Sequence, residues 1–340
     1  DEVSGRTFLE ATIIEGLKFK TSFNFDLINY NTLDYTNPKL GPAKENGGGV
    51  SRLNTRTFSW TWNNIVTYDK TIGEHHFNVL AGMESYSYRY DELTASRSKM
   101  AQPDMPELVV GSQLTGGSGY RIDYALVGYL TQLLYDYRNK YFFSASYRRD
   151  GSSRFAPETR WGNFWSLGAS WRVDRESFMA STSDWLSALT LKMSYGAQGN
   201  DNLGTYYASK GLYSIVSNLG ENALVSDRMA TPNLKWETNL NFNVGIDFSL
   251  FNNRFSGSFV TRRSKDLLYS RPIAPSLGYG SIDENVGALK NTGIEMVLNG
   301  TIINQNGWVW KLGMNLTHYK NKVTDLPLKD MPRSGVNKLQ

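Results

Sequence analysis

The stretch that decides the fold is NLNFNVGIDFSLF, residues 239–251, in which polar and apolar side chains alternate. The even positions are apolar: Leu240, Phe242, Val244, Ile246, Phe248 and Leu250. The odd positions carry Asn239, Asn241, Asn243, Gly245, Asp247 and Ser249. This period of two predicts a β-strand with one apolar and one polar face. In a soluble sandwich the apolar face would point inward, whereas in a membrane barrel it meets lipid and the polar face lines the lumen.

The same alternation recurs along the chain and predicts about twelve strands and an all-β fold. The predicted strands are 6–14, 17–30, 52–68, 74–97, 122–137, 141–150, 160–173, 187–199, 234–250, 254–270, 286–303 and 307–324. Most are much longer than the five or six residues, roughly, of a soluble strand. A strand crosses a bilayer in about nine to eleven residues, so length favours an antiparallel transmembrane barrel.

The predicted connections alternate in length. The short ones lie at 15–16, 69–73, 138–140, 251–253 and 304–306. The long ones lie at 31–51, 98–121, 200–233 and 271–285, and we expect them to be solvated loops. Outer-membrane barrels have short periplasmic turns and long extracellular loops, which this alternation matches. The connections at 151–159 and 174–186 fit the pattern less well.

The composition excludes several other classes of protein. The net charge is only +4 and charged residues make up 20% of the chain, so we expect no nucleic-acid partner. Cysteine is absent, which excludes disulfides and thiolate metal sites. Mean hydropathy is −0.43 and no apolar run is long enough for a transmembrane helix. Alternating strands average out to a polar value, so outer-membrane lipid remains the expected partner of the apolar faces.

The sequence carries no motif for covalent chemistry. We find no nucleophile elbow, paired-carboxylate motif or phosphate loop, so we expect no enzyme, no catalytic residue and no cofactor. His75 and His76 are adjacent on a predicted strand, face opposite sides and cannot chelate one metal together. The stretch GNDNLG (199–204) offers oxygen ligands but lacks the EF-hand spacing. We therefore expect no metal site, and a calcium site in this loop is the alternative.

Aromatic residues make up 13% of the chain, and many lie near predicted strand ends. The apolar-face tryptophans there are typical of a membrane aromatic girdle: Trp60, Trp62, Trp161, Trp308 and Trp310. A sugar-stacking platform is the alternative interpretation of these rings.

Charged residues recur on the polar faces, where they predict a hydrated wall stiffened by ion pairs: Lys18, Lys20, Arg148, Asp150, Arg172, Lys192 and Asp247. Residues near the outer strand ends and loops are candidates for ligand contact: Arg148, Asp150, Arg154, Asn200, Tyr206 and Tyr279.

Four segments carry a family resemblance. The stretch SYRRDGSSRFAPETRWGNFWSLGASWRVDRESFM (146–179) resembles the SusC/RagA family of TonB-dependent outer-membrane transporters. Further segments follow in the same order: 189–206 resembles a strand of that family and the loop after it, and 234–268 and 285–323 resemble two of its hairpins. A weaker match lies at 77–96. Leu203 stands where the family usually has isoleucine.

The resemblance implies a barrel of about 22 strands closed by an N-terminal plug. Residues 1–340 would then be one domain, an internal part of that barrel without the plug and the C-terminal strands. It implies import of a nutrient, mostly an oligosaccharide and in some members a peptide. The implied partners are a SusD-like substrate-binding lipoprotein and, through the N-terminal region, TonB–ExbB–ExbD. The implied location is the outer membrane of a Gram-negative, Bacteroidetes-like cell.

Two alternatives remain at this point. One is a self-contained barrel of about twelve strands, a porin or adhesin. The other is a secreted, β-rich carbohydrate-binding protein, which would have to bury its apolar faces against each other.

Overall fold

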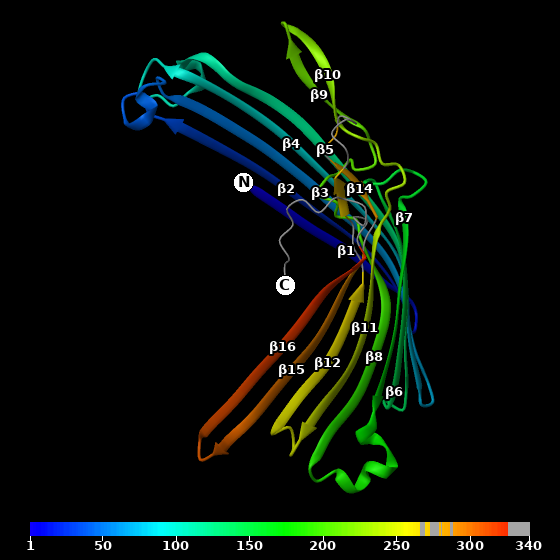
Figure 1. Cartoon of the computed structure of the whole chain (residues 1–340). Coiled ribbons are helices and arrows are strands. Elements are labelled where there is room, and N and C mark those ends of the chain that lie inside the picture. Colours follow the sequence, from blue (N-terminus) through cyan, green and yellow to red (C-terminus); the bar gives the residue numbers. More distant parts are fainter. Residues whose placement is uncertain (266–268, 273–278, 280, 286–287, 326–340) are drawn as a thin grey trace. The chain divides into compact units, whose positions relative to one another are not determined.

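The computed structural model describes residues 1–265, 269–272, 279, 281–285 and 288–325. Twelve strands are hydrogen-bonded in one sheet, and their order in the sheet is their order in the chain (Figure 1). They are β1 (Glu2–Ile14), β2 (Leu17–Thr36), β3 (Gly49–Ile72), β4 (His75–Met100), β5 (Gly111–Tyr137), β6 (Tyr141–Ser152), β7 (Trp161–Arg172), β8 (Leu186–Asn200), β11 (Glu237–Leu250), β12 (Phe255–Lys265), β15 (Ala288–Gln305) and β16 (Trp308–Asp325). The all-β fold and the twelve predicted strands are confirmed.

Short elements lie in the connections. Two strand pairs stand apart from the main sheet: β9 (Leu212–Asn218) with β10 (Glu221–Arg228), and β13 (Tyr269–Pro272) with β14 (Ser281–Glu284). The helical turns are η1 (Gly41–Lys44), η2 (Leu108–Val110), η3 (Val173–Arg175) and η4 (Ser177–Thr182). In the described part of the chain, no helix has the length and apolarity needed to cross a membrane.

The strand register separates the two faces as the alternation predicts. On one face β11 pairs Phe242 with Tyr195 and Ile246 with Leu191 of β8. On the other face the pairs are polar, such as Asn243 with Ser194. We call these the apolar face and the polar face. Large side chains of the apolar face stay exposed, Met193 at 53% for example, whereas a sandwich would cover them.

The predicted long loops contain strand residues, so those predictions are wrong in part. The predicted loop 98–121 ends early because β5 begins at Gly111. There the Arg97 guanidinium donates to the Gly111 carbonyl at 3.1 Å, and Ser112 donates to the Lys99 carbonyl at 3.3 Å. These contacts support strand pairing without alternating apolar residues.

The predicted loop 200–233 contains the β9–β10 hairpin. Its tip, Leu219–Gly220, has φ values of 54° and 89°, as the tight turns that join antiparallel strands require. The predicted loop 271–285 contains β14, the end of β13 and residues outside the described part.

The chain divides into two compact units. The first comprises 1–11, 19–65 and 83–127, and it is laced by surface ion pairs such as Arg89 with Asp123 at 2.7 Å. The second comprises 12–18, 66–82 and 128–340 and contains β6 to β16. Most of the candidate site residues lie in the second unit.

Candidate functional site

Residues of three loop segments pack into a small core at one end of β6, β7, β8 and β11. We call segments 152–160, 201–211 and 229–236 the outer loop cluster. Phe155, Ala208 and Leu234 are its centre, exposed by only 2%, 0% and 2%, and Leu203 and Trp236 pack against them. Few side chains elsewhere on this sheet are so well buried. The expectation of a freely solvated loop at 200–233 is therefore wrong for the parts that belong to the cluster.

A network of polar groups ties the cluster together. Arg154 donates through Nη1 to the Asp201 carbonyl and to Asn202 Oδ1, both at 3.0 Å. Its guanidinium lies over the ring of Tyr206, 4.6 Å from the ring centre. Ser152, fully buried, donates to Asp201 Oδ2 at 2.7 Å. Burying a guanidinium is costly unless such partners compensate it, so the network fixes how the loops approach each other.

An ion pair on the polar face lies just below the cluster. Arg148 Nε donates to both carboxylate oxygens of Asp150, at 2.7 and 2.8 Å, and Asp150 is buried. A Cβ atom at Gly128 of β5 would collide with the Asp150 carboxylate. The missing side chain at Gly128 therefore lets the ion pair lie flat on the neighbouring strand.

The remaining two ligand candidates lie apart from each other. Asn200 donates to Glu237 Oε2 at 3.0 Å and accepts from the backbone of Asn202, which joins it to the cluster. Tyr279 instead contacts Ser226 of β10 at 2.6 Å. The structure thus brings together Arg154, Asn200 and Tyr206, with Arg148 and Asp150 close by along β6.

Sequence reasoning missed several members of the cluster: Ser152, Asp201, Asn202 and Trp236. The signal was present, because they lie in the quoted stretches 146–179, 189–206 and 234–268. Trp236 donates its indole N–H to the Arg160 carbonyl at 2.7 Å and so closes the core. Across the described residues, no three histidine or carboxylate side chains are placed to hold a metal ion.

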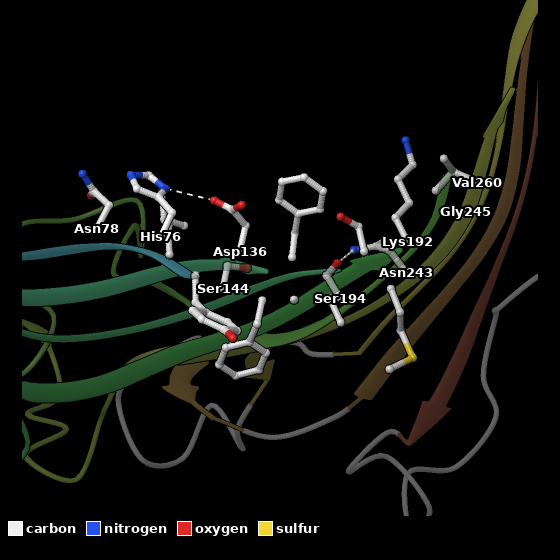
Figure 2. Close-up of a pocket in the computed structure, with 17 residues that line it drawn as sticks. His76, Asn78, Asp136, Ser144, Lys192, Ser194, Asn243, Gly245 and Val260 are labelled. Atoms are coloured by element: carbon white, nitrogen blue, oxygen red, sulfur yellow. Dashed lines mark hydrogen bonds and ion pairs between the residues drawn. The ribbon is translucent and has the colours of Figure 1, made fainter. Parts of the chain in front are cut away.

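A recess lies on the polar face of the second unit and encloses about 840 Å³ (Figure 2). Small residues line part of it, Ser144, Gly168 and Ser194 among them, beside larger ones such as Phe142. Lys192 lies at its rim and pairs with Asp247 at 2.6 Å. Such small side chains leave room for a partner surface to approach the backbone closely.

The expected ion pairs of the polar face are present. Besides Arg148–Asp150 and Lys192–Asp247, Lys20 lies 3.8 Å from Glu10. Arg172 pairs with Asp174 at 2.7 Å just after β7. The Arg172 guanidinium holds the pKa of Asp174 below its usual value.

The two histidines face opposite sides, as predicted. His75 contacts the Tyr135 hydroxyl at 2.8 Å, while His76 contacts Asp136 at 2.9 Å and Asp69 at 3.2 Å. Figure 2 shows the His76–Asp136 contact at one edge of the recess.

The predicted girdle tryptophans fall in three places. Trp60 stacks on Phe23 with ring centres 6.1 Å apart, and Trp62 donates to Thr21 at 3.0 Å. Trp308 and Trp310 are exposed at the start of β16. Trp161 stacks on Tyr129, with ring centres 6.3 Å apart.

A second aromatic cluster, which sequence reasoning missed, lies at the opposite end of the same strands. Tyr141 stacks between Tyr137 and Trp171, with ring centres 6.4 Å apart on both sides. Trp171 donates to Glu176 at 3.1 Å, and the Tyr141 hydroxyl donates to the same carboxylate. These hydrogen bonds, that of Tyr141 above all, hold the pKa of Glu176 below its usual value. Aromatic rings therefore mark both ends of the apolar face.

The comparison with known protein families identifies the class. Residues 7–339 match the model described as TonB dependent receptor-like, beta-barrel. The chain belongs to this family, whose members are β-barrels of the bacterial outer membrane. This confirms the SusC/RagA resemblance, the barrel fold and the expected location, and it excludes the secreted carbohydrate-binding alternative.

The individual relatives are receptors of Bacteroidetes. TonB-dependent receptor P3 of Formosa agariphila is 30% identical over 324 residues, 92% of this chain and 32% of that protein. TonB-dependent receptor SusC of Bacteroides thetaiotaomicron is 29% identical over 279 residues, 79% of this chain and 27% of that protein. These names are names of receptors, in agreement with the expectation that the chain is not an enzyme.

Solved structures support the same conclusion. The structure of the RagAB peptide transporter superposes with a TM-score of 0.86 at 27% identity, covering 96% of this chain and 36% of that one. The siderophore receptor PiuA of Acinetobacter baumannii shares the fold alone, with a TM-score of 0.57 at 13% identity. The chain thus spans about a third of the length of its relatives.

Proposed function

We propose that this chain forms part of the wall and outer loops of a receptor that imports a nutrient across the outer membrane, energised by TonB–ExbB–ExbD. The observation that carries the proposal is the family match over residues 7–339. The sheet supports it, because its polar face suits the lumen and its exposed apolar face suits lipid. In this proposal the recess on the polar face (Figure 2) faces the lumen, where small residues leave room for the plug.

An oligosaccharide is the proposed substrate class, and a peptide is the second candidate. The first follows from the SusC-type resemblance, since nutrients in that family are mostly glycans. The second is favoured by the fit to the structure of the RagAB peptide transporter. Among the six ligand candidates, Arg154 would position the loops, because its guanidinium is already engaged within the cluster. Arg148, Asp150, Asn200, Tyr206 and Tyr279 would lie along the path of the ligand.

A SusD-like lipoprotein is the proposed partner, and the β9–β10 hairpin is its proposed contact. Apolar side chains at the hairpin are widely exposed, Leu219 fully and Ile215 and Leu224 by more than two thirds: 100%, 73% and 71%. An isolated two-stranded hairpin is marginally stable in water, and exposed apolar patches mark interaction surfaces. A lipoprotein lid that covers the hairpin would stabilise its two strands and bury its exposed apolar side chains.

Uptake in the host tests the substrate. Deleting the gene should abolish growth on the cognate oligosaccharide while leaving growth on its monosaccharide unchanged. Growth restored by the wild-type gene, together with uptake of a fluorescent form of the glycan, would support import. If the mutant loses growth only on a peptide mixture, the peptide candidate replaces the glycan. Unchanged growth on both would contradict the proposal.

The orientation can be tested separately because the chain has no cysteine. Leu219→Cys, at the hairpin tip, should react with a membrane-impermeant maleimide on intact cells. Asn306→Cys, in the two-residue turn between β15 and β16, is the matched control and should react only after the cells are permeabilised. The reverse result would mean that the long loops face the periplasm.

A further inference from the structure

One charged side chain interrupts the apolar face of the second unit. At the apolar-face positions of β6, β7 and β8, all of them in the described part of the chain, Arg149 is the only charged residue. Arg149 is exposed, and no carboxylate of the described residues forms an ion pair with it. A cation without a counter-charge is costly on a lipid-facing surface, so its place on that surface calls for an explanation.

Arg149 lies where lipid headgroups begin. It follows Tyr141 by eight positions along β6, which is about 27 Å along the strand. At the usual strand tilt of about 35–45° this corresponds to about 19–22 Å of membrane thickness. The apolar band of an outer-membrane barrel is about 25 Å tall. Tyr141 belongs to the aromatic cluster at one end of this face, and Trp161 and Tyr129 form the cluster at the other end. Arg149 shares its end with Trp161 and therefore sits at the second interface.

The structure holds the Arg149 guanidinium in a built position. Its carbon lies over the Trp161 ring, 5.2 Å from the ring centre. The ring in turn lies across Gly151, where a Cβ atom would come within 3.0 Å of it. Tyr129 stacks on Trp161 with ring centres 6.3 Å apart. The aromatic surface limits the motion of the guanidinium and leaves its N–H groups free to bind a ligand.

We propose that Arg149, Trp161 and Tyr129 form a binding site for the phosphate of a phosphorylated glycolipid in the outer leaflet. A guanidinium binds phosphate through two parallel hydrogen bonds, and indole and phenol rings favour the headgroup region. The three side chains together offer a charge for the phosphate and flat apolar surface for the first acyl carbons. The inference rests on the outward direction of the long loops, which is part of the proposed function.

Native mass spectrometry of the complete receptor, purified from outer membranes, tests the site. The probes are diphosphoryl lipid A and the same lipid after removal of its phosphates. Arg149→Gln should weaken binding of the phosphorylated lipid about fivefold, the effect expected for one basic residue near a charged membrane surface. It should leave binding of the phosphate-free lipid unchanged. Arg149→Lys, which keeps the charge but loses the planar fork, should fall between wild type and Arg149→Gln.

Arg138→Gln is the matched control. Arg138 lies in the turn after β5, at the opposite end of the same strands, and pairs with Glu74 at 2.5 Å. This variant should bind both lipids as the wild type does. Equal affinity of wild type and Arg149→Gln for the phosphorylated lipid would overturn the proposal. An equal loss of affinity for both lipids in Arg149→Gln would also overturn it, because the lipids would then be bound by apolar packing alone.

If Arg149→Gln fails to assemble, the comparison of the two lipids on the wild-type receptor still tests the proposal. It must then prefer the phosphorylated lipid over the phosphate-free one, and Arg149→Lys must keep part of that preference. Equal binding of the two lipids by the wild type would overturn the proposal without any variant. This experiment measures lipid binding and not uptake, so a failure of the lipid-site proposal can be distinguished from a failure of the transport proposal. The cysteine labelling described above distinguishes a wrong orientation of the loops from the absence of a lipid site.

Discussion

The connection between β8 and β11 contains two regions that differ in the burial of their apolar side chains. Its two ends, 201–211 and 229–236, belong to the outer loop cluster and bury Ala208 and Leu234 almost completely. Its middle, the β9–β10 hairpin, exposes Tyr213, Ile215 and Leu224. Both regions are rich in apolar residues, so composition does not separate them.

The difference is in what each region has to pack against. The ends of the connection lie beside loop 153–160, which supplies Phe155 and Arg154. In the hairpin the two strands pair with each other, and Ser226 contacts Tyr279. Buried apolar residues here fix a scaffold, whereas exposed ones on the hairpin form a surface for a partner.

The largest effect is expected at the centre of the cluster. Phe155→Ala should lower the free energy of local opening by about 3–5 kcal/mol, the usual cost of removing a buried phenylalanine ring. Hydrogen exchange of peptides from 201–211 in the purified receptor measures this. Ile215→Ala, an exposed apolar residue of the hairpin, is the control and should leave those peptides unchanged. Slow exchange retained in Phe155→Ala would mean that the cluster is held by its polar network alone.

Removal of the central guanidinium should have the next largest effect. Arg154→Ala deletes the hydrogen bonds to Asp201 and Asn202 and should cost about 1.5–3 kcal/mol, as loss of charge-assisted hydrogen bonds does. Faster proteolysis between 201 and 211 is the readout. Arg154→Lys should recover only part of the protection, because an ammonium cannot match two acceptors and a ring as the planar group does. Full protection by lysine would show that charge alone is needed.

A smaller effect is expected at the other end of β7, outside the membrane. Arg172 lowers the pKa of Asp174, so the carboxylate stabilises the turn above its unfolded-state pKa of about 4. That contribution is lost as the pH falls through the lowered folded-state pKa. Pepsin cleavage within 173–185 should therefore rise steeply only at the most acidic pH.

Two variants sharpen this test. Asp174→Asn should make the turn equally susceptible at pH values on both sides of the transition. Arg175→Gln, which leaves the Arg172–Asp174 pair intact, should keep the wild-type pH dependence. A transition unchanged in Asp174→Asn would assign it to another carboxylate.

The smallest effect on stability is expected in the hairpin. Ile215→Ser should change the free energy of unfolding by less than about 0.5 kcal/mol, as most surface substitutions do. It should nevertheless reduce the amount of SusD-like lipoprotein that co-purifies with the receptor. Ser217→Ala, on the same strand and face, is the control. Undiminished co-purification in Ile215→Ser would remove the hairpin from the proposed interface.

The twelve-stranded sheet was well predicted from the sequence because side chains in a barrel wall alternate between its two faces. Each residue on β6, β7, β8 and β11 meets either lipid or the polar side, so alternation reveals both strand and face. The rule fails where strands leave the membrane. Residues 111–120 of β5 lack alternating apolar side chains, and cross-strand hydrogen bonds such as that from Arg97 support the pairing there.

The candidate site was predictable only in part, for a different reason. The stretch around Arg154 marked it as a loop-end residue, but its partners Asp201 and Asn202 lie 47 and 48 residues further along the chain. No local pattern states which loops will pack together. The same holds for Trp161, whose contact with Tyr129 depends on the register of three strands.

The order of the sheet has a kinetic consequence. Since strand order equals chain order, each strand of the main sheet pairs with the next sheet strand along the chain, and the sheet can grow by adding one strand at a time. The junction of β8 with β11 is slower, because residues 201–236 must first be looped out, at an entropic cost that rises with loop length. Early collapse of the outer loop cluster would shorten that loop. Formation of the cluster would then be a folding step that precedes the pairing of β11 and the strands after it.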